Sequence, residues 1–223
     1  MKPIKTVALG ALLLFPLVAF RFGGWAVITV DALRPYMVAG IPTTLDFMVR
    51  QHGVTPLGGL RPTVYLTSGR TELTVTAMPG RLAGQYSSTI TAPAPGEWTI
   101  RIVSGFMNAE NTLLPQRAIS ASSPVPRTLA DADVGHHLFF AKGCVTCHMR
   151  GDVGGRMGPD LTVRRYAPAV LSSFLADPES SPLSKGGAQN YVRMPNLGLS
   201  PREIGRLVAY LNSESVVGSA VGR

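Results

Sequence analysis

The chain has little cysteine: only Cys144 and Cys147 occur among its 223 residues. Residues 25–128 contain none, so no disulfide can hold that region together. The same absence excludes a blue-copper site there, because such a site needs a cysteine thiolate. Any chemistry that depends on thiols is therefore confined to one short stretch of the sequence.

The chain also lacks, near its start, an apolar run of clear membrane-spanning length. Lys2 and Lys5 precede the run Val7–Phe20, which is shorter than the about 20 residues of a transmembrane helix. Extension through Val30 would lengthen this run. The pattern predicts a signal peptide for export at residues 1–24, and a retained N-terminal membrane anchor is the alternative. Either one places the rest of the chain in the periplasm or on the outer face of a bacterial cytoplasmic membrane.

Acidic residues are few: 13 aspartates and glutamates stand against 21 lysines and arginines, for a formal net charge of +8. Part of this excess belongs to the N-terminal segment, through Lys2, Lys5 and Arg21. The modest positive charge that remains predicts no nucleic-acid partner. It does suit an anionic lipid surface or an acidic protein partner.

The segment Cys144-Val145-Thr146-Cys147-His148 has the spacing for covalent attachment of a c-type haem. Two thioether bonds would fix the porphyrin at the start of a helix, and His148 would bind the iron as its proximal ligand. A dithiol redox centre and half of a zinc site share the Cys-x-x-Cys pair. A redox dithiol is typical of a βαβ context and zinc needs two further ligands, and the sequence offers neither.

A second axial ligand is expected from a loop after the attachment motif. Met194 lies in such a loop, before the last predicted helix, and the simpler role of a methionine is to fill core space. Met149 and Met157 are closer to His148 in sequence and would cross less easily to the opposite face of a haem. We therefore predict Met194 as the distal iron ligand. A His/Met pair raises the reduction potential relative to two histidines.

Two helices frame this region of the sequence. Asp131 or Asp133 is expected to cap a helix that runs through Lys142, and Ser200 with Pro201 is expected to begin the last helix. The apolar residues of the last helix recur three and four positions apart, which predicts one buried stripe. They are Ile204, Leu207, Val208 and Leu211.

With these features, residues 129–213 resemble the class I, monohaem cytochrome c family. Gly135 and Phe139 on the first helix, and Leu207 and Tyr210 on the last, look like the positions at which the family's terminal helices cross. The resemblance implies an all-α domain that binds one covalently attached haem c and carries single electrons, not an enzyme. The family attaches its haem after export, in agreement with the predicted signal peptide.

The same resemblance implies further roles around the haem. Gly158–Leu161 is similar to a family segment whose proline carbonyl accepts a hydrogen bond from the proximal histidine, so Pro159 would orient His148. A proline that only shapes a turn is the simpler interpretation. Side chains that flank the expected crevice are candidates to pair with the haem propionates, although most arginines are simply solvated. These candidates are Arg164, Arg165, Tyr166 and Arg193.

Residues 25–119 consist of short alternating runs broken by glycine and proline, as in Leu45–Arg50 and Trp98–Ile102. Six or seven such strands predict an antiparallel, immunoglobulin-like β-sandwich. Trp25–Val54 also resembles, more weakly, the YtkA-like family of exported β-sandwich domains. The predicted fold class is thus multidomain, an all-β sandwich followed by an all-α cytochrome c domain. The remaining boundaries are a Pro- and Ser-rich linker at 120–128, the cytochrome c domain at 129–213 and a flexible tail at 214–223.

The leading hypothesis is an exported electron carrier that docks through its β-domain to a membrane respiratory or photosynthetic complex. Its partners would be an oxidase, a quinol-oxidising complex or a reaction centre, and electrons would leave through the haem edge near the attachment motif. An alternative is copper handling by the β-domain, since thioether and imidazole ligands suit Cu(I). The candidate ligands are scattered: Met37, Met48, His52, Met78 and Met107. Catalysis at the haem, such as peroxide reduction, needs an open iron position, which the presence of Met194 disfavours.

Overall fold

The computed structural model describes residues 24–163, 165–180 and 193–213 of the chain. The predicted signal or anchor segment, apart from Gly24, and the predicted tail lie outside these ranges. Within them, no helix combines the length and the apolar character needed to cross a membrane.

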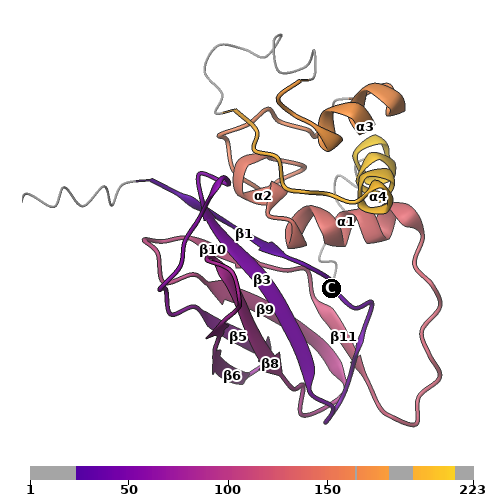
Figure 1. The fold of residues 1–223 in the computed structure, drawn as a ribbon. Helices are drawn as coiled ribbons and strands as arrows, with labels where there is room; N and C mark the ends of the chain where they lie inside the picture. The colour runs from indigo at the N-terminus through magenta and orange to yellow at the C-terminus, as the bar shows by residue number, and fades with distance from the viewer. Residues whose placement is uncertain (1–23, 164, 181–192, 214–223) are drawn as a thin grey trace, which may run out of the picture.

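The first part of the described chain is a β-sandwich of two sheets (Figure 1). One sheet has the strand order β1-β3-β8-β7, with β4 beside β3, and the other has the order β2-β11-β9-β5-β6, with β10 beside β9. The strands are β1 (Ala26–Val30), β2 (Met37–Val38), β3 (Thr43–Gln51), β4 (Thr55–Pro56), β5 (Thr63–Ser68), β6 (Thr71–Thr76), β7 (Met78–Pro79), β8 (Gln85–Ile90), β9 (Gly96–Val103), β10 (Glu110–Thr112) and β11 (Gln116–Ile119). The predicted all-β sandwich is confirmed. Its pairing is not purely antiparallel, because β2 and β11 run parallel.

The core of the sandwich comes from alternate residues of its strands. Along β3, Leu45, Phe47 and Val49 are buried while their neighbours are more exposed. Phe47 stacks on Tyr86 of β8 with ring centroids 5.9 Å apart. Because successive side chains of a strand point to opposite faces, this alternation turns one face of each sheet toward a shared core.

β1 is the exception, because all five of its residues are buried. Ala26, Ile28 and Val30 belong to the sandwich core. Val27, on the opposite face, is 3% exposed and lies against the helical part of the chain at Gly143. A strand covered on both faces can be apolar throughout. The sequence had allowed the N-terminal apolar run to extend through Val30. In the structure, Ala26–Val30 form this strand instead.

The second part of the chain is helical and lies above the sandwich in Figure 1. Its helices are α1 (Asp131–Ala141), α2 (Cys144–Cys147), α3 (Pro168–Ala176) and α4 (Pro201–Asn212). The predicted cap at Asp131 or Asp133 is wrong, since Ala130 is the N-cap residue and makes no side-chain cap bond. Both carboxylates instead lie in the first turn, where they face the positive end of the helix dipole. At α4, Ser200 and Glu203 form a reciprocal capping box, and Pro201 follows as expected.

α1 and α4 cross at Gly135. A Cβ at this position would lie 2.0 Å from the carbonyl oxygen of Arg206, so only glycine allows the helices to approach so closely. Phe139 packs near Tyr210 with ring centroids 5.7 Å apart. The four apolar residues predicted to form a stripe on α4 are all buried.

The helical domain is fastened to the sandwich by buried polar groups. The Nδ2 of Asn111 in β10 donates to the carbonyl oxygens of Ile28 at 3.1 Å and Phe140 at 2.9 Å. The Nε2 of Gln116 in β11 donates to Nδ1 of His137 in α1 at 3.1 Å, and it also donates to the carbonyl of Leu114. These bonds fix the end of α1, and hence the start of the attachment motif, relative to the sheets.

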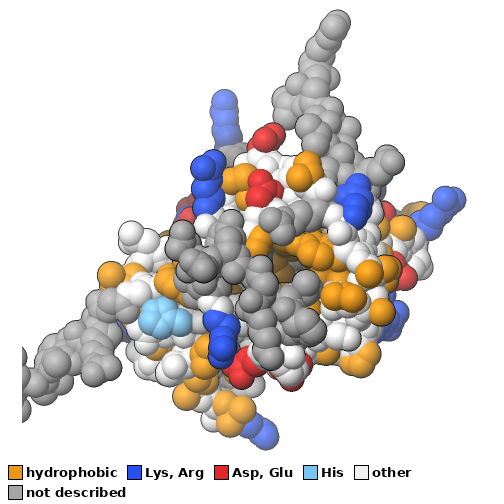
Figure 2. Space-filling view, turned by 90° about the horizontal axis from the view of Figure 1, so that it is seen from above, with side chains coloured by type: hydrophobic (Ala, Val, Ile, Leu, Met, Phe, Trp, Pro, Cys, Tyr) orange, Lys and Arg blue, Asp and Glu red, His pale blue; other side chains and the backbone are white. Residues whose placement is uncertain are grey.

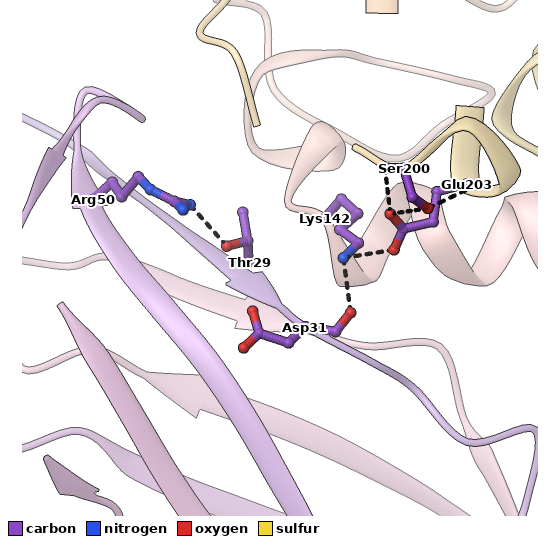
Figure 3. Close-up of polar contacts among 6 residues, drawn as sticks. All are labelled: Thr29, Asp31, Arg50, Lys142, Ser200 and Glu203. Atoms are coloured by element: carbon purple, nitrogen blue, oxygen red, sulfur yellow. Dashed lines mark hydrogen bonds and ion pairs between the residues drawn. The ribbon is translucent and has the colours of Figure 1, made fainter. Parts of the chain in front are cut away.

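Lys142 joins three elements at the same boundary (Figure 3). Its ammonium donates to the carbonyl oxygen of Asp31 at 2.9 Å and pairs with Oε1 of Glu203 at 2.8 Å. The Lys142 and Glu203 side chains are only 10% and 20% exposed. Burial would raise the pKa of Glu203, but the hydrogen bonds from Lys142 and Ser200 outweigh it and lower that pKa overall. The carboxylate is therefore stabilised in its charged form at the junction of both domains.

Candidate functional site

The two cysteines lie on the single turn of α2, directly after α1. Gly143 has a φ of 70°, and this left-handed residue turns the chain sharply between the two helices. A Cβ at Gly143 would meet Cγ1 of Val27 at 2.6 Å and the carbonyl oxygen of Ile28 at 2.8 Å. Because Cys144 and Cys147 are three residues apart in this turn, their side chains share one face of the helix.

His148 follows at the end of α2 with its imidazole held by the next loop. The Nδ1 of His148 donates to the carbonyl oxygen of Pro159 at 2.9 Å. A carbonyl only accepts, so this bond places the proton on Nδ1 and leaves Nε2 free to bind a metal. Burial lowers the pKa of His148, and the bond to Pro159 opposes this shift. Gly158 allows the close approach, since a Cβ there would lie 2.5 Å from Cε1 of the ring.

A pocket opens over these residues and extends to the predicted distal ligand. Met194 lies in it, together with Arg193, Pro195 and Leu197 of the same segment. The other lining residues are Trp25, Val27, Gly143, Cys144, Cys147, His148 and Met157. Seen from above, hydrophobic side chains gather near the middle of this face of the molecule, and lysines and arginines stand around its edge (Figure 2). The structure thus brings both thiols, an imidazole and two thioethers to one largely apolar space.

The surroundings of the two thiols give no support to a dithiol redox centre. Burial, together with the neighbouring Cys147, raises the pKa of the Cys144 thiol to about 12. Burial raises the pKa of Cys147 to about 11. A reactive dithiol needs at least one lowered thiol pKa. In the described part of the chain, no group of three or more His, Cys, Asp or Glu side chains is arranged to hold a metal ion, so the zinc interpretation gains no support.

The four candidate propionate partners have different positions. Arg193 lines the pocket. Arg165 is exposed and is not among the described lining residues, and Tyr166 packs on the helical core while its backbone amide and carbonyl bond to the side chain of Asn212. Arg164 lies outside the described residues. Only Arg193 of the described candidates therefore stands at the site.

Sequence reasoning missed Trp25 and Val27 as members of the site. Val27 comes from β1 of the other domain and Trp25 directly precedes that strand, so no spacing relative to the attachment motif could reveal them. The available signal was the run Ala26–Val30, which is apolar except for Thr29 and is typical of a strand covered on both faces. Such a run predicts that the strand is buried on both faces, but not which part of the chain covers the second face.

The candidate copper ligands lie on five different elements of the sandwich. Met37 is in β2 and buried in the core, and Met48 is in β3. Met78 in β7 and Met107 in the β9–β10 loop are 68% and 60% exposed. His52, in the β3–β4 turn, packs against Trp25 with the two rings tilted and their centroids 5.4 Å apart. Nothing in this placement of described residues favours copper binding.

Residues 132–215 match the family model for cytochrome c. The second domain of this chain is thus a cytochrome c domain, and the first is a β-sandwich. Among curated proteins, no sequence matches the chain.

Several solved structures are similar to part of the chain at low sequence identity. The Lin-41 filamin domain is 14% identical, with 44% of this chain and 93% of that domain covered at a TM-score of 0.34. The PKD domain of the human VPS10 domain-containing receptor SorCS2 is 14% identical, with 56% and 99% covered at a TM-score of 0.26. A superoxide reductase (neelaredoxin) from Ignicoccus hospitalis is 15% identical, with 42% and 80% covered at a TM-score of 0.28.

The residues of the pocket fit the covalently bound haem c that a cytochrome c domain implies. Cys144 and Cys147 provide two thiols on one helical face for the vinyl groups, and His148 has its free Nε2 for the iron. Gly158 provides the space that the imidazole occupies. The pocket would hold such a group through the His148 imidazole and a methionine thioether, and its lining is mainly apolar.

Proposed function

We propose that this protein is an exported carrier of single electrons whose haem c is held by Cys144, Cys147, His148 and Met194. The observation that carries the proposal is the single pocket lined by both thiols, the imidazole and the Met194 side chain. When bound, the haem supplies a one-electron ferric/ferrous couple. The match of residues 132–215 to cytochrome c supports electron transfer as the role of this domain.

The residues of the pocket have complementary tasks in this proposal. Pro159 fixes the tautomer and the plane of the His148 imidazole, and this tunes its strength as a ligand. Met194 would provide a second ligand to the iron, and small molecules would then find no open coordination site. Apolar side chains such as Leu197 exclude water, which keeps reorganisation small when the charge of the centre changes. Arg193 offers a cation to a propionate at the edge of the pocket.

Absorption spectra of the purified full-length protein, oxidised and reduced, test the axial ligation. We expect a weak methionine-to-iron band in the red and no spectral change with carbon monoxide. Met194→Ala should abolish the band and admit carbon monoxide. Met157→Ala is the matched control, since Met157 lines the same pocket, and it should keep the band. A parent protein that lacks the band and binds carbon monoxide rapidly would have an open iron, and catalysis or gas sensing would replace the carrier proposal.

We also propose that the carrier works on the periplasmic side of a membrane and delivers electrons to a membrane complex through contacts of its β-domain. Much of the sandwich surface points away from the helical domain and is available for such contacts (Figure 1). The excess of basic residues suits an acidic partner. Electron transfer to isolated bacterial membranes should then slow as ionic strength rises, because salt screens attraction between exposed charges. A rate that does not depend on salt would contradict electrostatic docking.

The fate of residues 1–24 can be settled by the mass of the exported protein. A cleaved signal peptide predicts a mature chain that begins near Trp25 and is released with the periplasmic fraction. A retained anchor predicts the full mass and a membrane-bound protein. Either result agrees with export, and a full-length protein without haem in the cytoplasm would contradict it.

A further inference from the structure

The edge of the β-sandwich touches the candidate haem pocket at its attachment side. Trp25 and Val27, at the start of β1, line the same pocket as both cysteines and His148. Val27 is almost completely buried and packs directly on Gly143, the residue before Cys144. The attachment side of the pocket, where electrons were expected to leave, is therefore bordered by the other domain.

The same edge also touches the segment that carries Met194. Gly53, in the β3–β4 turn, has a φ of +74°, and a Cβ there would lie 2.4 Å from Cγ of Pro195. Pro195 directly follows Met194 and lines the pocket beside it. The turn at Gly53 and the segment that carries Met194 therefore lie so close together that no side chain fits between them at Gly53.

The two contacts belong to one connected surface. The backbone N–H of His52 donates to the carbonyl oxygen of Trp25 at 3.0 Å, and their rings are in contact. This surface, consisting of Trp25, Val27, His52 and Gly53, is called the sandwich edge below. It is fastened to the helical domain by the buried bonds of Asn111 and Lys142.

We infer that the sandwich edge is a fixed wall of the haem crevice and positions the Met194 segment, so that the β-domain helps to set the reduction potential. This inference rests on the proposed function through the ligand role of Met194. Residues 193–199 contain no helix or strand, so backbone bonds within a regular element do not hold the methionine in place. Met194 packs on the helical core and Asn196 donates to the carbonyl oxygen of Ala176, and the packing of Pro195 against Gly53 adds a constraint from the β-domain. An apolar wall at Trp25 and Val27 also limits access of solvent, and burial is one of the properties that tune a haem potential.

A pair of glycine variants in the full-length, haem-loaded protein tests the wall. Gly53→Ala inserts a methyl group against Pro195. Gly59→Ala is the matched control, because Gly59 has nearly the same φ of +73° but would place its Cβ in open space. We expect Gly53→Ala to shift the midpoint potential and to weaken the red methionine-to-iron band. The control carries the same backbone strain and should change neither quantity.

A double-mutant cycle shows whether the effect passes through Pro195. Pro195→Ala removes the Cγ atom that the new methyl group would meet. The potential shift caused by Gly53→Ala should be clearly smaller in the Pro195→Ala background, since contacting residues couple and distant ones add. Trp25→Ala is a second test that adds no backbone strain at Gly53. It removes a large side chain from the sandwich edge at the attachment side of the pocket and should also shift the midpoint potential.

The outcomes separate the wall from the proposed ligation. If Gly53→Ala and Gly59→Ala have the same midpoint potential, and Trp25→Ala has the potential of the parent, the proposed role of the sandwich edge is refuted while the carrier proposal stands. If the parent lacks the red band, Met194 is not the ligand, and the potentials of the same variants still decide whether the sandwich edge borders the haem. If Gly53→Ala does not fold, Trp25→Ala alone gives the decision.

Discussion

Arg150 is a charged residue that is buried between two elements of the helical domain. Its guanidinium donates to four backbone carbonyls, those of Leu161 at 3.0 Å, Leu211 at 3.3 Å, Tyr210 at 2.9 Å and Ser213 at 3.1 Å. Its Cζ also lies 4.5 Å from the centroid of the Tyr210 ring. The side chain thus satisfies carbonyls at the end of α4 and ties that end to the loop after the attachment motif.

Replacement of Arg150 by methionine should destabilise the helical domain strongly. The change leaves several carbonyls without a donor in a buried site, for an expected loss of about 3 kcal/mol in the free energy of unfolding. Urea unfolding followed by circular dichroism measures this loss. Arg156→Met is the control, because Arg156 is exposed and its replacement should cost less than about 0.5 kcal/mol. Equal losses in both variants would refute the role of Arg150.

His136 and His137 should make stability depend on pH. Burial lowers the pKa of both, and Asp133 opposes this shift in each case. His137 also accepts a hydrogen bond from Gln116, which a protonated imidazole could not do. The unfolded chain therefore takes up protons near pH 6.5, while the folded protein does so only at lower pH. The contribution to stability is fully present well above pH 6.5 and should fall as the pH drops from about 7 to 5.

Chemical unfolding at a series of pH values measures this dependence, with the haem spectrum recorded to exclude a change of ligation. His137→Gln removes one titrating group, so its unfolding free energy should depend less steeply on pH than that of the parent. Identical slopes in parent and variant would show that His137 is not one of the groups responsible.

At the scale of elements, the crossing of α1 and α4 separates two glycines that look alike in sequence. Gly135 leaves no room for a Cβ, whereas a Cβ on Gly205 of α4 would meet nothing within 4 Å. Gly135→Ala should cost more than about 2 kcal/mol, since the helices must move apart. Gly205→Ala should instead stabilise by roughly 0.5–1 kcal/mol, because alanine has the better helix propensity. Thermal unfolding of both variants measures the contrast, and a loss in both would contradict it.

The strands show where alternation in the sequence succeeds and where it fails. β3 and β9 were predicted from their alternating runs, and Leu45, Trp98 and Ile100 are buried as this pattern requires. Leu73 in β6 fits the same pattern but is 36% exposed. β6 lies at the end of its sheet, where only one neighbouring strand supports it. Alternation indicates which side chains share a face, and the position of the strand in the sheet decides whether that face is covered.

At the scale of the whole molecule, Lys142 should couple the two domains. Lys142→Met removes a cation from a mostly buried pair and leaves both Glu203 and the Asp31 carbonyl without this donor. We expect a loss of about 3 kcal/mol in the free energy of unfolding. The two domains should also unfold less cooperatively, which haem absorbance measures for the cytochrome c domain and tryptophan fluorescence for the sandwich. Arg101→Met breaks the exposed pair with Glu110 and should cost no more than about 1 kcal/mol. Equal effects would mean that the buried pair contributes no coupling.

The sequence by itself determined the chemistry of the cytochrome c domain and the class of both domains. The attachment motif, the capping box at Ser200 and the stripe on α4 are local patterns, because each depends on residues within one or two helical turns. Such patterns report which face of an element is apolar and which end is capped. They were sufficient to predict α4 with its N-cap serine, and α1 apart from its cap.

Only the tertiary structure decided how the two domains share that site. The contacts of Val27 with Gly143 and of Gly53 with Pro195 join residues that are distant in sequence. Periodicity shows that Val27 has an apolar environment but not which neighbour provides it, since burial is non-directional and many surfaces would satisfy it. The position of the sandwich edge depends instead on specific hydrogen bonds between the two domains, among them those donated by Nδ2 of Asn111 and Nζ of Lys142.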